Sequence, residues 1–334
     1  MPSTREGREA LDVIIVSYRC CDLLRFCLRS LREHAPRRPI RVWVVDNSSH
    51  DGTVELVRED FPEVVLNALD DNVGFGAASN LGIGQGDGGY VLVLNPDTSV
   101  GEGSLDRLIE LMDSQPDVGI AGCRLVRADG SLDHAAKREF PTLLSALGHF
   151  TRIGRRAGAR GRLAAYRAPE LESGKVDAVN GAFMLIRRRA LEEVGLFDEG
   201  YWMYMEDLDL CYRFAQAGWV TWYDSGATVF HVKGGSSGKH RTARLNYAFH
   251  YGMLRFYRKH YAQHRSGLVN LLVYVGIAVK LSVSMPRAAL LRRVERVGSA
   301  LRGGSHGPRP GAAPQLPRAE RAAPRETPLH ERSS

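Results

Sequence analysis

The segment 90–97, Tyr-Val-Leu-Val-Leu-Asn-Pro-Asp, is the feature that most limits what this chain can fold into. Four consecutive apolar residues at 91–94 predict a strand that is buried on both faces. Pro96 ends that strand, because proline has no N–H for a β ladder and disfavours helical geometry in the residue before it. Asp97 is therefore expected just past the carboxyl end of a strand, where open α/β sheets bind ligands. A carboxylate there suits a hard divalent cation, although aspartate is also a common turn residue.

Apolar runs of this kind alternate along the chain with segments whose apolar residues recur at helical spacing. We expect strands at 12–17, 41–46, 64–66, 90–94, 119–125, within 176–186, at 220–223 and at 228–230. Helices are expected after the first run, over 53–59 and from about residue 205. Strands that alternate with helical segments predict an α/β fold with a parallel, doubly wound sheet.

Polar residues stand where several of these strands end, and the ends of parallel strands meet at one crevice. The residues expected there are Ser17, Tyr18, Asp46, Asn47, Asn95 and Asp97. Asp46 suits a ribose hydroxyl or a base N–H. The glycine-rich turn 72–80 opens a helix, and backbone amides at such a turn suit a diphosphate. Its Gly-Phe-Gly lacks the G-x-G-x-x-G spacing of a dinucleotide site and follows the third strand, which counts against a dehydrogenase.

A second acidic group, Glu206 and Asp207 with Asp209, begins the helix expected near residue 205. Carboxylates in the first turn of a helix are favoured by the helix dipole, so these residues are either simple caps or catalytic groups. Three aromatic neighbours, Tyr201, Trp202 and Tyr204, suit the flat face of a sugar ring. His231, at the end of an apolar strand, is either a metal ligand or a core histidine.

The C-terminal third changes in character. A helix is expected over 242–264, and the apolar run 268–279 is too short and too interrupted for a confident transmembrane prediction. That run either packs in the core or lies in a bilayer interface beside the Arg-rich segment 287–302, and the interface is favoured because the charge and the apolar run adjoin. The segment 152–167 holds six Arg and no acidic residue, which indicates either a solvated or an anion-binding loop.

Charge and cysteine content limit the setting of the chain. The net charge is +7, and ten Arg against four Glu fall within 287–334, so the basic character belongs to a terminal segment and points to an anionic surface. None of these features predicts a nucleic-acid partner. The five cysteines form no C-x-x-C pair, and the N-terminus carries no apolar segment of a secretory signal. We therefore expect a cytoplasmic protein.

The motifs, taken in order, resemble family 2 glycosyltransferases of the GT-A fold over roughly residues 10–240. They are Val-Ile-Ile-Val-Ser-Tyr18, Val-Val-Asp-Asn-Ser-Ser49 with Gly52-Thr53, Asn72-x-Gly-Phe-Gly-x-x-x-Asn80, Leu-Asn-Pro-Asp97, Asn180-Gly181-Ala, Phe197-Asp-Glu199, Met205-Glu-Asp-Leu-Asp-Leu-Cys-Tyr-Arg213 and His231. The resemblance implies a Rossmann-like, mostly parallel sheet flanked by helices. It places a tail at 1–10, a donor half at 11–100, an acceptor half at 101–240, a helical, membrane-associated extension at 241–301 and a disordered tail at 302–334.

The resemblance also implies an inverting transfer from a nucleotide-diphosphate sugar with Mg²⁺ or Mn²⁺. Asp97 would bind the metal together with His231, although Asn95 replaces the first acid of the usual D-x-D. Asp207 matches the catalytic base. The donor would contact Ser17, Tyr18, Asp46, Asn47, Asn72, Gly74, Phe75, Asn80, Asn95 and Asp97. The acceptor would contact Glu206, Trp202, Asn180 and Gly181.

Within the family, the chain looks most like bacterial rhamnosyltransferases that act on lipid-linked saccharides in cell-wall or surface-polysaccharide synthesis. This narrower resemblance implies L-rhamnose from dTDP-rhamnose and a peripheral position at the inner face of the cell membrane. No Q-x-x-R-W motif follows the acidic group, so a processive polymerase is not expected. The alternatives are a sugar nucleotidyltransferase and a non-catalytic scaffold that binds nucleotide sugars beside a membrane.

Overall fold

A mixed, mostly parallel sheet forms the centre of the protein. The computed structural model describes residues 9–127, 129–133, 135–141, 173–232 and 242–301, with side chains as far as residue 286. Within these residues the main sheet has nine strands in the order β3-β2-β1-β4-β10-β6-β11-β5, and β8 also pairs with β11. The strands are β1 (Leu11–Ser17), β2 (Ile40–Asp46), β3 (Val65–Ala68), β4 (Tyr90–Leu94), β5 (Thr98–Val100), β6 (Val118–Val126), β8 (Ser173–Val176), β10 (Phe183–Arg187) and β11 (Val220–His231).

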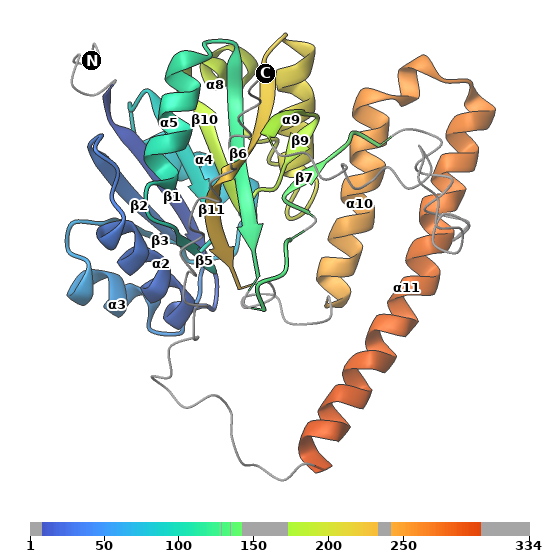
Figure 1. The fold of residues 1–334 in the computed structure, drawn as a ribbon. Helices are drawn as coiled ribbons and strands as arrows, with labels where there is room; N and C mark the ends of the chain where they lie inside the picture. The colour runs from blue at the N-terminus through green and yellow to red at the C-terminus, as the bar shows by residue number, and fades with distance from the viewer. Residues whose placement is uncertain (1–8, 128, 134, 142–172, 233–241, 302–334) are drawn as a thin grey trace, which may run out of the picture.

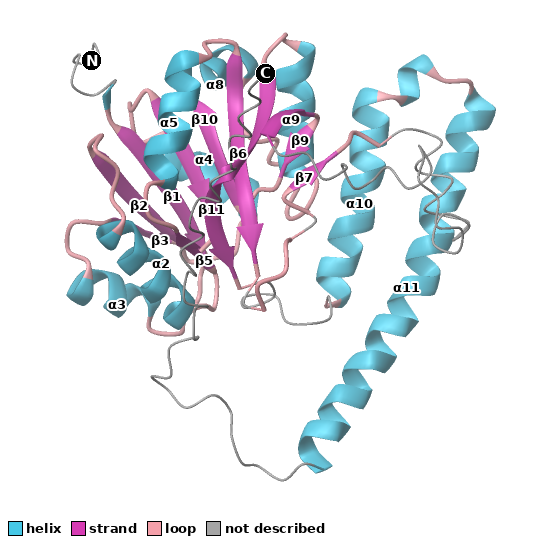
Figure 2. Ribbon diagram, viewed as in Figure 1, coloured by secondary structure: helices cyan, strands magenta, loops and turns pink. Residues whose placement is uncertain are grey.

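The predicted strand 90–94 is confirmed as β4, and all five of its residues are buried. It lies between β1, to which it is parallel, and β10, to which it is antiparallel. A short second sheet pairs β7 (Lys137–Arg138) with β9 (Ala178–Val179). The parallel half β3-β2-β1-β4 therefore has its carboxyl ends on one edge, as the sequence predicts (Figure 2).

Helices cover both faces of the sheet (Figure 1). One apolar core lies under α2 (Cys21–Glu33), α3 (Thr53–Asp60) and α5 (Ser104–Ser114). The other lies under α4 (Phe75–Ile83), α8 (Arg188–Val194) and α9 (Glu206–Gln216). The inward residues of each helix recur three and four apart, as Leu24, Cys27, Leu28 and Leu31 do in α2. Sequence periodicity thus sets which helix face meets the sheet.

Two sequence expectations about element boundaries are wrong. The strands expected at 220–223 and 228–230 form one strand, β11, because Asp-Ser-Gly-Ala at 224–227 makes an irregularity inside the β6 pairing and not a turn out of the sheet. The run 268–279 and the residues 287–301 of the Arg-rich segment lie in one helix, α11 (Gly267–Leu301), that continues through Pro286. The carbonyl that this proline leaves without a donor belongs to Ser282, which is exposed, so water can satisfy it.

The C-terminal helices pack as a hairpin beside the sheet domain. The helix expected over 242–264 is α10 (Ala243–His260) followed by the short 3₁₀ turn η1 (Ala262–His264), and Thr242 caps α10 through a bond from Leu245 N. Figure 1 shows α10 between the sheet domain and α11. The basic segment 152–167, the disordered tail predicted at 302–334 and most of the N-terminal tail lie outside the described residues.

Candidate active site

The carboxyl edge of the parallel strands brings the predicted donor residues together. Ser17 pairs in register with Asp46 across β1 and β2, and Asn47 N donates to Ser17 O at 2.8 Å. Asp46 is 4 % exposed, and its Oδ2 accepts from Ser49 N. Its buried Oδ1 makes no hydrogen bond within the described residues, so this oxygen is available to a ligand donor. Tyr18 follows at the rim with the Arg19 guanidinium over its ring.

In the glycine-rich turn before α4 the amides of residues 73–75 are bonded within the protein, so these three are not open to a diphosphate. Gly74 N donates to Asn72 Oδ1, and Phe75 N donates to Trp202 O at 2.9 Å. Asn47 braces the same turn, because its side chain donates to Gly74 O and accepts from Val73 N. Gly74 is required here, since a Cβ would stand 2.4 Å from Trp202 O. The turn therefore holds the backbone at Trp202 in place.

Asn80, also expected at the donor, is used inside the fold. Its Nδ2 donates to Phe197 O and Glu199 Oε1, and its Oδ1 accepts from Phe197 N. Both ends of the amide are thus occupied by the segment that leads to the second acidic group. These contacts give Asn80 a bracing role within the described residues, and its expected contact with the donor stays a prediction.

Asp97 meets His231 because two strands pair. β5 and β11 place His231 opposite Thr98, and Val232 N donates to Asp97 O at 2.8 Å. The imidazole Nε2 lies 3.3 Å from Asp97 Oδ1, and its Nδ1 lies 3.3 Å from Asp133 Oδ2. All three side chains are buried. Burial lowers the pKa of His231, but Asp133 and Asp97 together raise that pKa to about 9.

These residues fit a divalent cation of the kind that takes its remaining ligands from a substrate. Oδ1 of Asp97 is buried and has no hydrogen-bond partner in the described residues apart from the facing imidazole. Asp133 on the far nitrogen is the carboxylate that commonly orients a metal-binding histidine. The described residues hold no cluster of three or more metal-type side chains in ligand geometry. One carboxylate and one imidazole therefore suit Mg²⁺ or Mn²⁺ only together with substrate phosphates.

Asp207 stands at the start of α9 and is held from three sides. Its Oδ2 accepts from Arg138 Nη2 at 2.6 Å and from Gly181 N at 2.9 Å, and its Oδ1 accepts from Leu208 N at 2.7 Å. The chain enters α9 through Tyr204 and Met205, which both have positive φ, at 69° and 74°. Two such residues in a row are strained backbone, which is concentrated at functional sites.

Glu206 lies beside Asp207 and is 5 % exposed. Burial and the negative charge of Asp207 raise the pKa of Glu206 well above its usual range. Its Oε2 makes no hydrogen bond among the described residues. A buried carboxyl that is neutral at pH 7 can donate a hydrogen bond, so Glu206 is suited to orient a hydroxyl, while Asp207 is the ion-pair partner of Arg138.

The segment 180–182 joins the two acidic centres. Asn95 N donates to Ala182 O at 3.0 Å, and Gly181 N donates to Asp207. Asn180 holds the turn, because its Oδ1 accepts from Ala182 N. A Cβ at Gly181 would meet Asp207 at 3.4 Å. The predicted acceptor residues 180 and 181 thus position the base by contacts within the protein.

Trp202 is held against the glycine-rich turn before α4. Its indole N–H donates to Asn72 O, and the Arg244 guanidinium lies 3.9 Å from its ring centre. Asp209, the third acid of the group, is instead structural: it is fully buried and pairs with Arg213, Lys259 and His260. It fastens α9 to α10.

Sequence reasoning missed Arg138 and Asp133. Both residues lie in the irregular stretch after β6, where the spacing of apolar residues predicts neither a strand nor a helix. Arg138 is placed by the two-residue strand β7, and its Nη2 also donates to Val179 O. Asp133 is placed by turn bonds to residues 125 and 136. The contacts that bring these two residues to the site, Arg138 with Asp207 and Asp133 with His231, join segments far apart in sequence.

A mixed, mostly parallel sheet with Asp97 at one strand end, linked to the start of α9 through residues 180–182, is the architecture of a glycosyltransferase of the GT-A type. The sequence profile described as Glycosyl transferase family 2 matches residues 12–195. The chain belongs to this family, as its motifs imply, which replaces the nucleotidyltransferase and scaffold alternatives.

Known proteins resemble the chain beyond that domain. It is 35 % identical over 250 residues to the Mycobacterium tuberculosis N-acetylglucosaminyl-diphospho-decaprenol L-rhamnosyltransferase, covering 71 % of this chain and 80 % of that protein. It is 30 % identical over 152 residues to the rhamnosyltransferase WbbL of Escherichia coli, covering 43 % and 55 %.

Two solved structures share the fold. The mannosyltransferase PcManGT of Pyrobaculum calidifontis, in complex with GDP-Man and Mn²⁺, has a TM-score of 0.53 at 17 % identity, covering 89 % of this chain and 76 % of that one. GalNAc-T7 with UDP, GalNAc and Mn²⁺ has a TM-score of 0.54 at 14 % identity, covering 75 % and 47 %. These likenesses confirm the GT-A fold.

Proposed function

We propose that the protein moves L-rhamnose, with inversion and without processivity, from dTDP-rhamnose to a lipid-linked saccharide in cell-wall or surface-polysaccharide synthesis. The observation that supports the reaction type is the link from the strand end that carries Asp97 to Asp207: Asn95 N donates to Ala182 O, and Gly181 N donates to Asp207. The choice of sugar and acceptor rests on the 35 % identity to a rhamnosyltransferase whose name includes a diphospho-decaprenol acceptor.

In this proposal the oxygen of the acceptor hydroxyl attacks the anomeric carbon of the donor sugar, and Asp207 takes the proton of that hydroxyl. The bond from that carbon to the diphosphate breaks on the opposite face, and the electron pair leaves with the diphosphate. General-base catalysis of this kind contributes roughly 10²–10⁴ in rate. Arg138 orients the carboxylate of Asp207, while Glu206 donates to the acceptor.

Asp97 and His231 would hold Mg²⁺ or Mn²⁺, which when bound offsets negative charge on the leaving diphosphate. The Mn²⁺ in both related complexes supports this, because the two solved relatives hold their nucleotide or nucleotide sugar with that ion. Oδ1 of Asp46 would accept from a ribose hydroxyl or the base N–H. Ser17, Tyr18, Asn47, Asn72 and Asn95 would complete the walls of the donor site.

A donor panel tests this function. The protein is incubated with N-acetylglucosaminyl-diphospho-polyprenol and, in turn, dTDP-rhamnose, UDP-glucose, UDP-N-acetylglucosamine and GDP-mannose, and the lipid product is weighed by mass spectrometry. We expect a gain of one deoxyhexose with dTDP-rhamnose. A larger yield with another donor would show that rhamnose is not the preferred sugar. Product formed equally well in the presence of EDTA would show that the transfer does not depend on a divalent metal.

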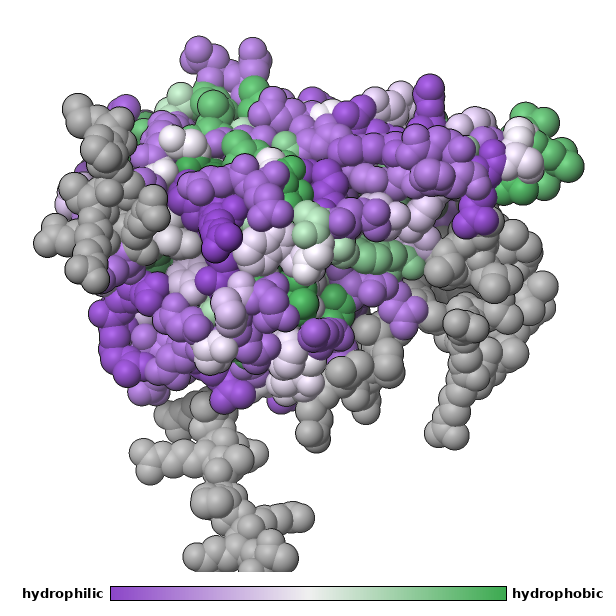
Figure 3. Space-filling model, turned by 90° about the horizontal axis from the view of Figure 1, so that it is seen from above, coloured by the Kyte–Doolittle hydropathy of each residue, from purple (hydrophilic) through white to green (hydrophobic). Residues whose placement is uncertain are grey.

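We further propose that the protein is cytoplasmic and binds the inner face of the cell membrane through α11. Six apolar side chains of α11 are exposed on one face of the helix: Leu268, Leu271, Leu272, Val275, Val279 and Val283. The face of α11 that bears Asn270 and Ser284 instead bonds α10. This exposure supports the interfacial position of the run over packing in the core. Seen from above, apolar side chains gather at the edge formed by the hairpin (Figure 3).

By length and composition alone, residues 267–286 of α11 are also long and apolar enough to cross a membrane. An interfacial position is favoured, because α10 occupies the other face of the helix and a helix in the interface needs only one apolar face. The Arg-rich stretch from residue 287, whose backbone continues α11, would contact anionic lipid.

Flotation with lipid vesicles tests this attachment. Changing Leu271 and Val275 to Gln should release the protein from vesicles, whereas Val65→Gln, an exposed apolar residue of β3 at the far edge of the sheet, should not. Extraction of the wild-type protein by carbonate at high pH is expected for an interfacial helix. Resistance to carbonate would show that α11 spans the bilayer.

A further inference from the structure

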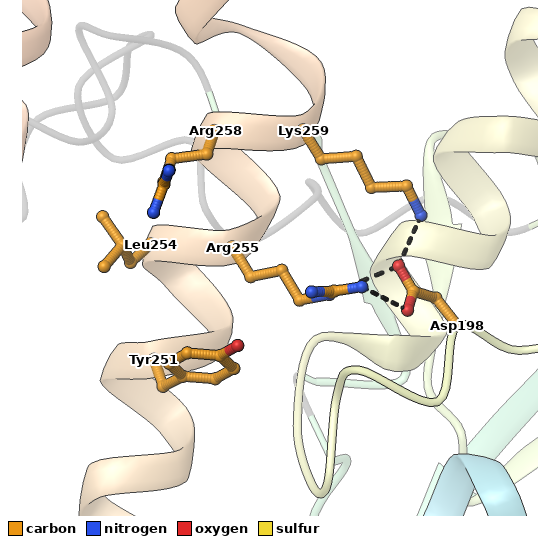
Figure 4. A pocket seen from close by; sticks show the side chains of 6 residues that line it. All are labelled: Asp198, Tyr251, Leu254, Arg255, Arg258 and Lys259. Atoms are coloured by element: carbon orange, nitrogen blue, oxygen red, sulfur yellow. Dashed lines mark hydrogen bonds and ion pairs between the residues drawn. The ribbon is translucent and has the colours of Figure 1, made fainter.

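A basic hollow lies between α10 and the segment that leads to the active site. It has a volume of about 580 Å³ and is lined by Asp198, Tyr251, Leu254, Arg255, Arg258 and Lys259. The five residues on α10 recur three and four apart and so share one face of the helix. Figure 4 shows Arg255 and Lys259 reaching across to Asp198, with Arg258 and Leu254 apart from that carboxylate.

The hollow keeps more positive than negative charge. Arg255 Nη2 and Lys259 Nζ each lie 2.7 Å from an Asp198 oxygen, so both cations are held in place by one carboxylate. Arg258 is exposed and makes no ion pair with any described residue. Two fixed cations and a third without an acidic partner suit a phosphate group, because guanidinium and ammonium groups donate charge-assisted hydrogen bonds to phosphate oxygens.

The same helix connects this hollow to the catalytic base. Gly252, one residue after Tyr251, packs so closely on the α9 entrance that a Cβ there would stand 3.0 Å from Tyr204 O. Lys259 also reaches Asp209 in α9, at 2.9 Å. The hollow therefore keeps a fixed position relative to Glu206 and Asp207, which begin α9.

The helix also connects the hollow to the apolar stripe of α11. Tyr257 donates to Asn270 Oδ1 at 2.7 Å, and Asn246 donates to Ser284 Oγ at 2.9 Å, so α11 is fixed along α10. The exposed stripe of α11 faces away from these bonds. Since α10 lies between α11 and the sheet domain, a molecule anchored beside α11 passes α10 before it reaches the active site (Figure 1).

We propose that this hollow binds the diphosphate of the lipid-linked acceptor, with Arg258 as the main ligand and Arg255 and Lys259 beside it. This inference rests on the proposed function. The polyprenyl chain stays in the bilayer next to α11, Tyr251 and Leu254 contact its first carbons, and the saccharide extends toward Asp207. The site thus recognises an acceptor by its diphosphate and sets how far the acceptor hydroxyl reaches.

Binding to two kinds of vesicle tests the site. Phosphatidylcholine vesicles are doped either with polyprenyl diphosphate or with phosphatidylglycerol at the same total negative charge, and affinity is measured by flotation. The wild-type protein should prefer the diphosphate vesicles. Arg258→Gln should reduce that preference about tenfold, the loss expected for one charge-assisted hydrogen bond. Arg265→Gln, which removes an exposed cation from the turn before α11, should weaken both kinds of binding equally.

Each outcome decides the proposal. A wild-type protein with no preference for diphosphate, or an unchanged preference in Arg258→Gln, would overturn it. Sugar transfer is measured separately on the same proteins. If the preference holds and no donor is transferred, the site stands and the proposed function fails. If transfer occurs and the preference does not depend on Arg258, the function stands and the site fails.

Discussion

Arg138 donates a hydrogen bond of 2.6 Å to Oδ2 of Asp207, and the two side chains are 12 % and 10 % exposed. An arginine so close to a carboxylate forms an ion pair with it and fixes its direction through a charge-assisted hydrogen bond. The amide of Gly181 holds the same oxygen, so both donors fall on one side of the carboxylate. We interpret Arg138 as a positioning residue for the proposed proton transfer.

The first prediction concerns this pair. Arg138→Met should reduce kcat about 100-fold, because a base that loses its orientation loses much of the 10²–10⁴ that general-base catalysis supplies. Donor affinity, measured by titration calorimetry, should change little. Arg138→Lys should retain part of the kcat that the Met variant loses, since lysine keeps the positive charge but lacks the planar guanidinium group. Equal losses in Lys and Met variants together with a lower melting temperature would assign Arg138 to folding alone.

The second prediction separates the two adjacent acids. Asp207→Asn should keep donor binding and lose transfer by at least about 100-fold. Glu206→Gln should lose far less, because a carboxyl whose pKa is raised by burial and by Asp207 is largely neutral at pH 7, and glutamine reproduces a neutral donor. Initial rates under saturating donor give the comparison. Normal turnover by Asp207→Asn, or a larger loss in Glu206→Gln, would contradict the assignment and would indicate that Glu206 is the base.

Much of the site follows from local sequence, and the rest depends on distant contacts. The strand at 90–94, its abrupt end and the first turn of α9 are encoded within a few residues, so Asp97 and Asp207 could be predicted. Arg138 and Asp133 could not, because neither lies in a periodic segment. Asn80 illustrates the reverse case: its motif is local, but its bonds to Phe197 and Glu199 cross more than a hundred residues.

The third prediction concerns the proposed metal residues. Asp97→Ala should abolish the dependence of donor binding on Mn²⁺, measured by calorimetry with and without the ion. Asp133→Asn should weaken that binding about 10–100-fold, as expected for a group that orients a metal-binding histidine. His231 would keep its place in β11 in both variants. Donor binding by Asp97→Ala that still responds to Mn²⁺ would place the metal elsewhere.

The fourth prediction uses two glycines with nearly the same backbone angles. Gly74 has φ 93° and ψ 173°, and Gly195 has φ 92° and ψ 166°. Alanine strains both, but only at position 74 does its Cβ meet backbone, at 2.4 Å from Trp202 O, whereas at 195 the nearest atom is 3.8 Å away. Gly74→Ala should therefore lower the free energy of unfolding by about 1–3 kcal/mol more than Gly195→Ala. Urea unfolding measures the free energy of unfolding of each variant. Equal losses would show that the backbone at Trp202 can shift to make room for the Cβ.

The last prediction is the pH dependence of the Asp209 cluster. Burial opposes ionisation, but His260, Arg213 and Lys259 together hold the pKa of Asp209 well below its usual range. Because folding lowers this pKa, the ion pairs contribute stability that is complete above the unfolded value, about 3.9, and is lost as pH falls below it.

Asp209→Asn should therefore destabilise the protein by about 3–5 kcal/mol at pH 7, because it leaves buried cations without their partner. The difference from wild type should shrink as pH falls from about 5 to 2, because Asp209 takes up a proton in the unfolded wild-type chain while the folded carboxylate stays charged. Melting temperatures across this range measure the effect. Asp60→Asn, which removes an exposed ion-pair partner of Arg25, should cost under about 1 kcal/mol at every pH. A constant difference for Asp209→Asn would mean that its hydrogen bonds and not its charge hold α9 to α10.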